Sequence, residues 1–335
     1  MPSLKSKTLH KIGNGLFKYI YKNPERNMLR LVKVGKAFAG KMYPESTFTK
    51  PIEIITDESN VWHQFLFRGI KEVNPDFLRR AVLTFGIDLG LIGTSTLRKK
   101  REELHCNIPW VVLLDPTSAC NLKCTGCWAA EYGYKSNLTL DEMRRIISES
   151  KELGTHFFMF TGGEPLIRKK DLITLAKENP DCIFLAFTNA TLIDDEFCEQ
   201  LIECGNFGLA LSIEGTEETN DGRRGDGAYK TTMNAMKMLK KHGCLFGTSI
   251  CYTSSNYKAV TSDEFYDKMI EAGVRYMWYF HYMPIGDGAN VDLMLNAEQR
   301  EYMIHRVREI RGYTGGKPIF CIDFQNDGEF VGGCI

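Results

Sequence analysis

From residue 110 onward, short apolar runs alternate with segments of helical periodicity. The apolar runs predict strands that begin near Trp110, His156, Ile183, Gly208, Phe246, Arg275 and Pro318. Between them, apolar positions recur at helical spacing over Thr139–Leu153, Asp171–Glu178, Asp194–Glu203, Gly227–His242, Ser262–Ala272 and Ala297–Arg311. Repeated strand–helix units predict a parallel sheet with the helices packed outside it. Thr139-Leu-Asp-Glu142 has the spacing of a capping box, which predicts a helix start at Thr139.

Residues 1–105 have mainly helical periodicity, and prolines interrupt it at positions 24, 44, 51 and 75. The first helix is predicted to be amphipathic. One face carries Leu9, Ile12, Leu16 and Ile20, and the opposite face carries Lys7, Lys11, Lys18 and Lys22. We favour a helix that docks on the rest of the protein with its lysines in water. The alternative is peripheral contact of residues 7–22 with an anionic membrane surface.

Composition restricts the class of protein. The chain has 335 residues, 43% of them hydrophobic and 25% charged, as in ordinary globular proteins. Its 42 basic and 42 acidic residues cancel, so we expect no specific nucleic-acid binding. Residues 1–41 nevertheless hold ten Lys or Arg and one acid, Glu25, which gives a local charge of +9.

The chain contains eleven cysteines, an odd number, and shows no signal-peptide pattern. No apolar run reaches the roughly 18 residues that a membrane-spanning helix needs. We therefore expect a cytoplasmic location, peripheral to a membrane under the alternative above, with thiols that are free or bound to metal rather than paired in disulfides.

Three cysteines lie close together after the first predicted strand, as Cys120-x3-Cys124-x2-Cys127. Thiolates bind soft metals, and this spacing lets three sulfurs face one centre from a single loop. A structural zinc site usually needs a fourth ligand, here a remote His or Cys. A four-iron cluster held by three thiolates instead leaves one iron open for chemistry.

The second predicted strand ends in Thr161-Gly162-Gly163-Glu164-Pro165. Together with the three cysteines, this element resembles the radical S-adenosylmethionine (SAM) superfamily, over roughly Trp110 to Asp323. The resemblance implies an α/β fold, a partial (β/α)6 TIM-like barrel with a helical N-terminal extension. We expect the extension over 1–105, the radical SAM core over 106–311 and a C-terminal tail over 312–335.

The resemblance also implies the chemistry. Cys120, Cys124 and Cys127 would hold a [4Fe–4S] cluster, and Gly162, Gly163, Glu164 and Pro165 would line the methionyl part of SAM. Reductive cleavage of SAM would then yield a 5′-deoxyadenosyl radical, which takes hydrogen from an unidentified peptide, protein or lipid-like substrate. Such an oxidoreductase needs a reductant such as flavodoxin or ferredoxin and an anaerobic setting. The alternative is a non-catalytic iron–sulfur electron carrier, but a pure carrier needs no SAM pocket.

Later strand ends supply the remaining candidate SAM contacts. They are Thr188 and Asn189 after the third strand, Ser212 and Glu214 after the fourth, and Arg224, which aligns better than Arg223 with an arginine of the family. Two weaker candidates follow the sixth strand: His281 for substrate, and the segment Tyr282–Gly286 for adenine.

The sequence departs from the family at Gly126, because an aromatic residue is common before the third cysteine. Trp128 either substitutes for it or belongs to the core. Of the other cysteines, we expect Cys182, Cys198, Cys204, Cys244 and Cys251 to behave as small core hydrophobes.

The tail ends in Gly332-Gly-Cys334-Ile335. This context resembles the start of the second cluster region in radical SAM proteins with SPASM or twitch extensions. The resemblance implies that Cys334 is a ligand of an auxiliary cluster in a longer natural chain, and Cys321, separated from it by twelve residues, is a weaker partner. The alternative is that Cys334 is an ordinary terminal thiol.

Overall fold

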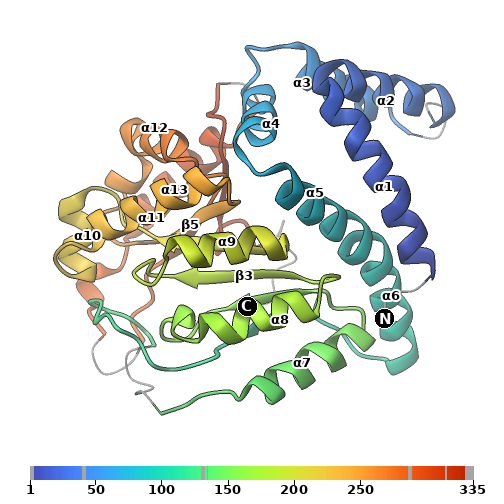
Figure 1. The fold of residues 1–335 in the computed structure, drawn as a ribbon. Coiled ribbons are helices and arrows are strands. Elements are labelled where there is room, and N and C mark those ends of the chain that lie inside the picture. The colour runs from blue at the N-terminus through green and yellow to red at the C-terminus, as the bar shows by residue number, and fades with distance from the viewer. Residues whose placement is uncertain are drawn as a thin grey trace.

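The computed structural model of the protein describes residues 4–39, 43–129, 133, 135–285, 289–313 and 315–328. One sheet of seven parallel strands dominates it, and each strand pairs with the next in chain order (Figure 1). The strands are β1 (Val112–Leu114), β2 (Phe157–Phe160), β3 (Ile183–Thr188), β4 (Phe207–Ser212), β5 (Phe246–Tyr252), β6 (Tyr276–His281) and β7 (Phe320–Asp323). The predicted partial barrel is confirmed. Each connection between strands places its helix on the outer face, and the sheet curls into a half-barrel.

Helices connect consecutive strands and cover the outer face of the sheet. They are α7 (Leu140–Glu152), α8 (Lys169–Glu178), α9 (Asp195–Cys204), α10 (Glu217–Arg224), α11 (Ala228–His242), α12 (Asp263–Ala272) and α13 (Ala297–Ile310). The capping box is confirmed, because Thr139 Oγ1 accepts from the Glu142 amide and the Glu142 carboxylate accepts from the Thr139 amide. Short 3-10 turns, η3 (Pro165–Arg168), η4 (Ala259–Thr261) and η5 (Val291–Leu293), complete the connections.

The main core lies between the outer face of the sheet and these helices. Phe160, Phe184 and Phe207 are fully buried there, and the rings of Phe160 and Phe184 stack with centroids 5.8 Å apart. Offset aromatic pairs of this kind add to the free energy of ordinary apolar burial.

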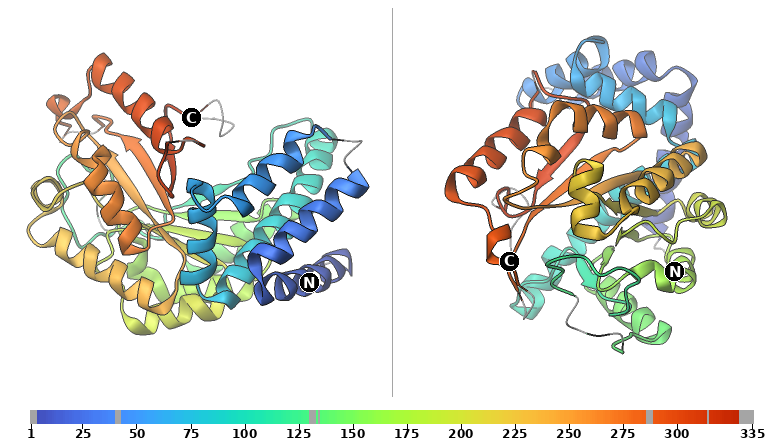
Figure 2. Two further views of the ribbon diagram at one scale, coloured as in Figure 1. Left: turned by 90° about the horizontal axis from the view of Figure 1, so that it is seen from above. Right: turned by 90° about the vertical axis from the view of Figure 1, so that its left-hand side faces the viewer.

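The N-terminal extension is helical, as its periodicity predicts. Its elements are α1 (Leu4–Lys22), α2 (Pro24–Ala39), α3 (Ser46–Thr56), α4 (Val61–Glu72), α5 (Pro75–Leu83), the π-helix η1 (Thr84–Gly93) and α6 (Thr94–Leu104). Figures 1 and 2 place the extension at the end of the molecule opposite α10.

The extension is anchored where barrel helices end and strands begin. Arg68 of α4 donates to the carbonyls of Ile270, Val274 and Pro318, and Arg80 of α5 donates to the Cys204 carbonyl. The carbonyls of Ile270 and Cys204 lie in the last turns of α12 and α9. The last carbonyls of a helix lack intrahelical partners, so the two guanidinium groups supply donors to these helix ends. Val73 and Phe77 of the extension also belong to the barrel's own core. The extension therefore shares a core with the barrel, and the domain boundaries stay predictions.

Helix α1 docks through neither of its two predicted faces. Ser6 and His10 bond to the buried Asp88 of η1, at 2.9 and 2.6 Å. Gly13 lies against Leu83, where a Cβ would be 2.6 Å from a leucine methyl. This contact side lies between the apolar and basic faces, and it leaves Ile12 and Leu16 56% and 44% exposed.

No helix in the described part of the chain is long and apolar enough to cross a membrane.

Candidate active site

The three motif cysteines lie in the loop that follows β1. Cys120, Cys124 and Cys127 all line one cavity of about 360 Å³. The cavity lies at the carboxyl ends of the strands. Thr161, which follows β2, and Thr188 and Ser212, the last residues of β3 and β4, also line it. Active sites of parallel α/β barrels form at this end.

The arrangement of the thiols decides which metal group they fit. Among the described residues, no three His, Cys, Asp or Glu side chains are grouped closely enough to hold a single metal ion. A zinc ion would draw its thiolates to about 2.3 Å from one point. A four-iron cluster takes each thiolate on a different iron and so needs them spread around a cavity. The three thiols, which line one cavity, are a donor set that fits such a cluster.

Two arginines contact the cysteine loop. Arg224 Nη1 is 4.0 Å from the Cys124 sulfur, and the Arg223 carbonyl accepts from the Thr125 amide at 2.8 Å. Burial raises the pKa of the Cys124 thiol, and the positive charges of Arg224 and Arg223 oppose that rise. Because the thiolate is the form that binds metal, the two guanidinium groups favour the liganding state.

The paired glycines after β2 are required by the cysteine loop itself. Gly162 has φ +101°, and a Cβ there would be 2.6 Å from the Thr117 carbonyl oxygen. A Cβ on Gly163 would be 2.2 Å from the Ala119 carbonyl oxygen. The sequence suggested close approach to a ligand, but on their Cβ side both glycines meet backbone, and of the two only Gly163 lines the cavity.

Glu164 links the ends of β2 and β3. Its carboxylate is buried and accepts from Leu166 N at 2.9 Å, Thr188 Oγ1 at 2.7 Å and Asn189 N at 2.7 Å. Burial raises the pKa of this carboxyl, while the three hydrogen bonds and Arg224 oppose the rise. Pro165 follows as the first residue of η3. The predicted contact of Glu164 with the SAM ammonium stays a prediction, and three of its acceptor positions are already used.

Asn189 connects this network to the cysteines. Its amide nitrogen is 3.9 Å from the Cys120 sulfur and donates to Asn121 Oδ1 at 2.8 Å. Its oxygen accepts from the Thr191 amide and hydroxyl. The Thr188–Asn189 pair thus holds one side of the cysteine loop in place.

Glu214 lies behind the cavity wall. It is fully buried, and one carboxylate oxygen accepts from Arg223 Nη1 at 2.8 Å and from Arg224 Nη2 at 2.6 Å. Asn256 donates to the other oxygen at 3.3 Å. Glu214 is absent from the described lining, whereas both arginines and Ser212 are part of it. Contact of Glu214 with SAM also stays a prediction, and the structure shows the carboxylate orienting two arginines.

The departure from the family at Gly126 has a structural reason. Gly126 has φ +66°, and a Cβ would be 2.6 Å from the ring of Tyr282, which follows β6. An aromatic ring from a distant segment therefore occupies the space beside the third cysteine. Trp128 also lines the cavity and is 42% exposed, so it is not a core residue.

The far wall of the cavity is mostly apolar. Phe187, Phe280 and Phe324 line it, with ring centroids 5.8 Å apart for Phe187–Phe280 and 5.4 Å apart for Phe280–Phe324. His281 lines it too. Its Nδ1 is buried and has no hydrogen-bond partner among the described residues, and burial lowers its pKa, which favours the neutral ring.

Cys251 is the site residue that sequence reasoning placed wrongly. It was expected in the core, but it lines the cavity beside the three motif cysteines. Burial raises the pKa of its thiol to about 11, and Arg223 opposes the rise. Strand alternation could have revealed it, because side chains along β5 point alternately to the two faces of the sheet. By contrast, Cys321 is fully buried in β7, and Cys334 lies outside the described residues.

Comparison with known proteins agrees with this geometry. Residues 114–267 match the sequence model of the radical SAM superfamily. Residues 114–267 are therefore a radical SAM domain, and proteins of this superfamily use a [4Fe–4S] cluster and SAM.

Two archaeal relatives and one bacterial relative illustrate the similarity. The chain is 26% identical to the Fe-coproporphyrin III synthase of Methanosarcina barkeri, over 66% of this chain and 57% of that protein. It is 30% identical to the AdoMet-dependent heme synthase of the same organism, over 61% of this chain and 59% of that protein. It is 27% identical to the serine-type anaerobic sulfatase-maturating enzyme of Klebsiella aerogenes, over 70% of this chain and 63% of that protein. The chain thus spans less than two thirds of the length of these relatives.

Solved structures share the fold. Streptococcus suis SuiB bound to S-adenosylmethionine superposes with a TM-score of 0.59 at 15% identity, over 93% of this chain and 65% of that one. The enzyme anSMEcpe with bound AdoMet and the Cp18Cys peptide gives a TM-score of 0.54 at 22% identity, over 66% of each chain.

Proposed function

We propose that this protein cleaves SAM reductively and uses the resulting carbon radical to oxidise a substrate at the cavity. The single observation that carries the proposal is the convergence of three loop thiols, Gly163, Glu164 and Arg224 on one cavity. When bound, a [4Fe–4S] cluster with one open iron supplies the electron that breaks a carbon–sulfur bond of SAM. An electron carrier would need only the thiols.

The chain's own residues would position the reactants. Cys120, Cys124 and Cys127 would each ligate one iron. Arg224, oriented by Glu214, presents a positive charge next to Cys124, where it could also meet the SAM carboxylate. The ring of Tyr282 beside Gly126 is the candidate adenine contact. The phenylalanine wall excludes water, which protects a reactive carbon radical.

The test is anaerobic reconstitution with iron and sulfide, followed by addition of SAM and a strong reductant. We expect 5′-deoxyadenosine from the wild-type protein and none from Cys124→Ala. Cys251→Ala is the matched control, because it removes a thiol from the same cavity without removing a predicted iron ligand, and it should retain the iron. Reconstituted wild-type protein that never cleaves SAM would refute the proposal.

A reductant such as flavodoxin or ferredoxin would supply the electron. The substrate class is a peptide, protein or lipid-like molecule; relatives named for tetrapyrrole and for protein substrates both occur, and SuiB has been solved with its precursor peptide SuiA.

We also propose peripheral contact of the extension with an anionic membrane. Four apolar side chains on α1 and α2 are strongly exposed: Ile12, Leu16, Val34 and Phe38, the last at 86%. The same segment, residues 1–41, carries the local charge of +9. Exposed apolar groups within a basic surface are typical of interfacial helices.

Vesicles that contain phosphatidylglycerol test this contact. Changing both Ile12 and Leu16 to Ser should lower vesicle binding about tenfold or more, since each side chain loses apolar burial. The control changes Val291 and Met294, which are exposed on the barrel, to Ser. Equal vesicle binding by the two double variants would refute membrane contact through α1.

A further inference from the structure

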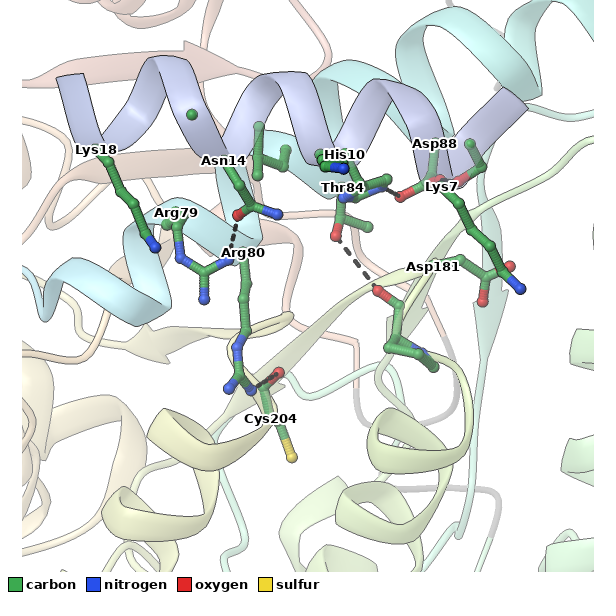
Figure 3. Close-up of a pocket in the computed structure, with 15 residues that line it drawn as sticks. Lys7, His10, Asn14, Lys18, Arg79, Arg80, Thr84, Asp88, Asp181 and Cys204 are labelled. Atoms are coloured by element: carbon green, nitrogen blue, oxygen red, sulfur yellow. Dashed lines mark hydrogen bonds and ion pairs between the residues drawn. The ribbon is translucent and has the colours of Figure 1, made fainter. Parts of the chain in front are cut away.

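A second cavity lies at the amino ends of the strands, away from the candidate active site. Its volume is about 760 Å³. It is bounded by α1, by the continuous segment α5–η1, and by Asp181 and Cys204, which precede β3 and β4 (Figure 3). Because β3 has six residues at about 3.3 Å each, roughly 20 Å separate the two sites.

The cavity has an excess of positive charge. Five permanent cations line it: Lys7, Lys11, Lys18, Arg79 and Arg80. The three lysines lie four and seven residues apart on α1, which puts them on one side of the helix over about 16 Å. In the described part of the chain, none of these lysines forms an ion pair.

The two acids that line the cavity already have partners. Asp88 bonds to Ser6 and His10 and so fastens α1 to η1. Asp181 pairs with Lys151 at 2.8 Å, and Lys151 is not a lining residue. Five cations against two acids leave the lining with an excess of positive charge.

Hydrogen bonds hold the two arginines at the cavity wall. Arg79 Nη1 donates to Asn14 Oδ1 at 2.6 Å, from α5 across to α1, and its Nη2 pairs with the exposed Asp76 of the same helix at 3.2 Å. Arg80 uses Nη1 for the carbonyls of Glu203 and Cys204, and its remaining guanidinium nitrogens make no described hydrogen bond. Figure 3 shows Lys18 extending from α1 toward Arg79, and Lys7 extending toward Asp181 at the other side of the cavity. Guanidinium groups held in this way bind phosphate oxygens in pairs.

We propose that this cavity binds a phosphate-bearing polyanion. Its volume falls in the range of small-ligand sites. Its charge suits several phosphate groups or a phosphorylated headgroup. No Phe, Tyr or Trp is among the described lining residues, so the lining favours recognition of phosphate groups over stacking of a nucleobase. The ligand is recognised by its phosphates, whether free in solution or on a lipid.

The experiment compares two probes and two triple variants. The probes are inorganic tripolyphosphate, measured by calorimetry, and vesicles of phosphatidylglycerol in phosphatidylcholine, measured by co-sedimentation. The cavity variant changes Lys7, Lys11 and Lys18 to Gln. The matched control changes Lys22, Arg30 and Lys33 to Gln, which removes the same charge from exposed positions on α1 and α2 outside the cavity.

We expect saturable binding of at least one probe that weakens about fivefold for each cavity lysine removed, the usual weight of one lysine at an anionic surface. The control variant should bind tripolyphosphate as the wild type does. Binding of tripolyphosphate assigns a free phosphate ligand. Vesicle binding that the cavity variant weakens more than the control variant does assigns a lipid headgroup; both results support the site. Equal weakening in the two variants would show a general charge effect and overturn it, as would no binding of either probe.

The cavity variant also separates this proposal from the catalytic one. Because the lysines lie at the opposite ends of the strands, SAM cleavage and iron content should be unchanged in it. Phosphate binding therefore stands or falls independently of catalysis.

Discussion

At the scale of single residues, Glu164 and Gly126 have structural roles that their motifs do not indicate. Glu164 accepts hydrogen bonds from Leu166 of η3, from Thr188 at the end of β3 and from the following Asn189. Gly126 leaves space for the ring of Tyr282, which follows β6. Both residues join segments far apart in the chain. Their substitution should therefore change stability as well as SAM binding.

Glu164→Gln should lower the free energy of unfolding by about 1–3 kcal/mol, because the amide NH₂ faces donors and leaves one of them unpaired in the interior. SAM affinity should fall by about one to two decades if the carboxylate also meets the ammonium group. Urea unfolding and SAM titration measure the two effects separately. Glu178→Gln, which changes an exposed carboxylate paired with Arg144, is the control and should cost less than about 1 kcal/mol. Full stability of Glu164→Gln would contradict the linking role.

Gly126→Ala should destabilise the protein, because an alanine is strained at φ +66° and its Cβ collides with Tyr282. Combining it with Tyr282→Ala should relieve the collision, so the double variant should lose less than the sum of the single losses by about 0.5–3 kcal/mol. Gly69→Ala in α4, where a Cβ meets nothing within 4 Å, serves as the control. Strict additivity in the cycle would show that the two residues do not compete for space.

At the scale of elements, strands and helices of the barrel were predictable because a buried parallel sheet leaves a strong local pattern. Each predicted strand start lies within a few residues of an observed strand, and the helix start at Thr139 is marked by its own capping residues. The π-helix η1 and the docking side of α1 were not predictable. They depend on contacts of Asp88 with Ser6 and His10 and of Leu83 with Gly13, all at least seventy positions apart in the chain. Cys251 was missed because its apolar neighbours resemble a core, although strand alternation places it inside the barrel.

Arg68 tests how α4 holds the barrel. Burial, together with the charge of Arg275, lowers its pKa to about 10. Its guanidinium donates to three carbonyls near the amino ends of β6 and β7. Arg68→Ala should lower the free energy of unfolding by at least about 2 kcal/mol, because these carbonyls lose a charged donor. Arg145→Ala, at an exposed pair with Glu149, should cost no more than about 0.5 kcal/mol. If urea unfolding gave the same loss of unfolding free energy for Arg68→Ala and Arg145→Ala, Arg68 would not stabilise the packing of the extension on the barrel.

At the scale of the whole molecule, each end of the sheet has a cavity of its own. The carboxyl ends gather the thiols, the arginines and the aromatic wall around one cavity. The amino ends carry the helical extension and the basic cavity beneath α1. Among the described residues, the two cavities have no lining residue in common.

The central claim is that Cys120, Cys124 and Cys127 hold a four-iron cluster with one iron open to SAM. Mössbauer spectroscopy of the iron-57 reconstituted protein, with and without SAM, tests it most directly. We expect about four irons per chain, with about one quarter of the iron signal changing when SAM is added, since only one iron lacks a protein thiolate. A single metal ion per chain, or a four-iron spectrum that SAM leaves unchanged, would contradict the account.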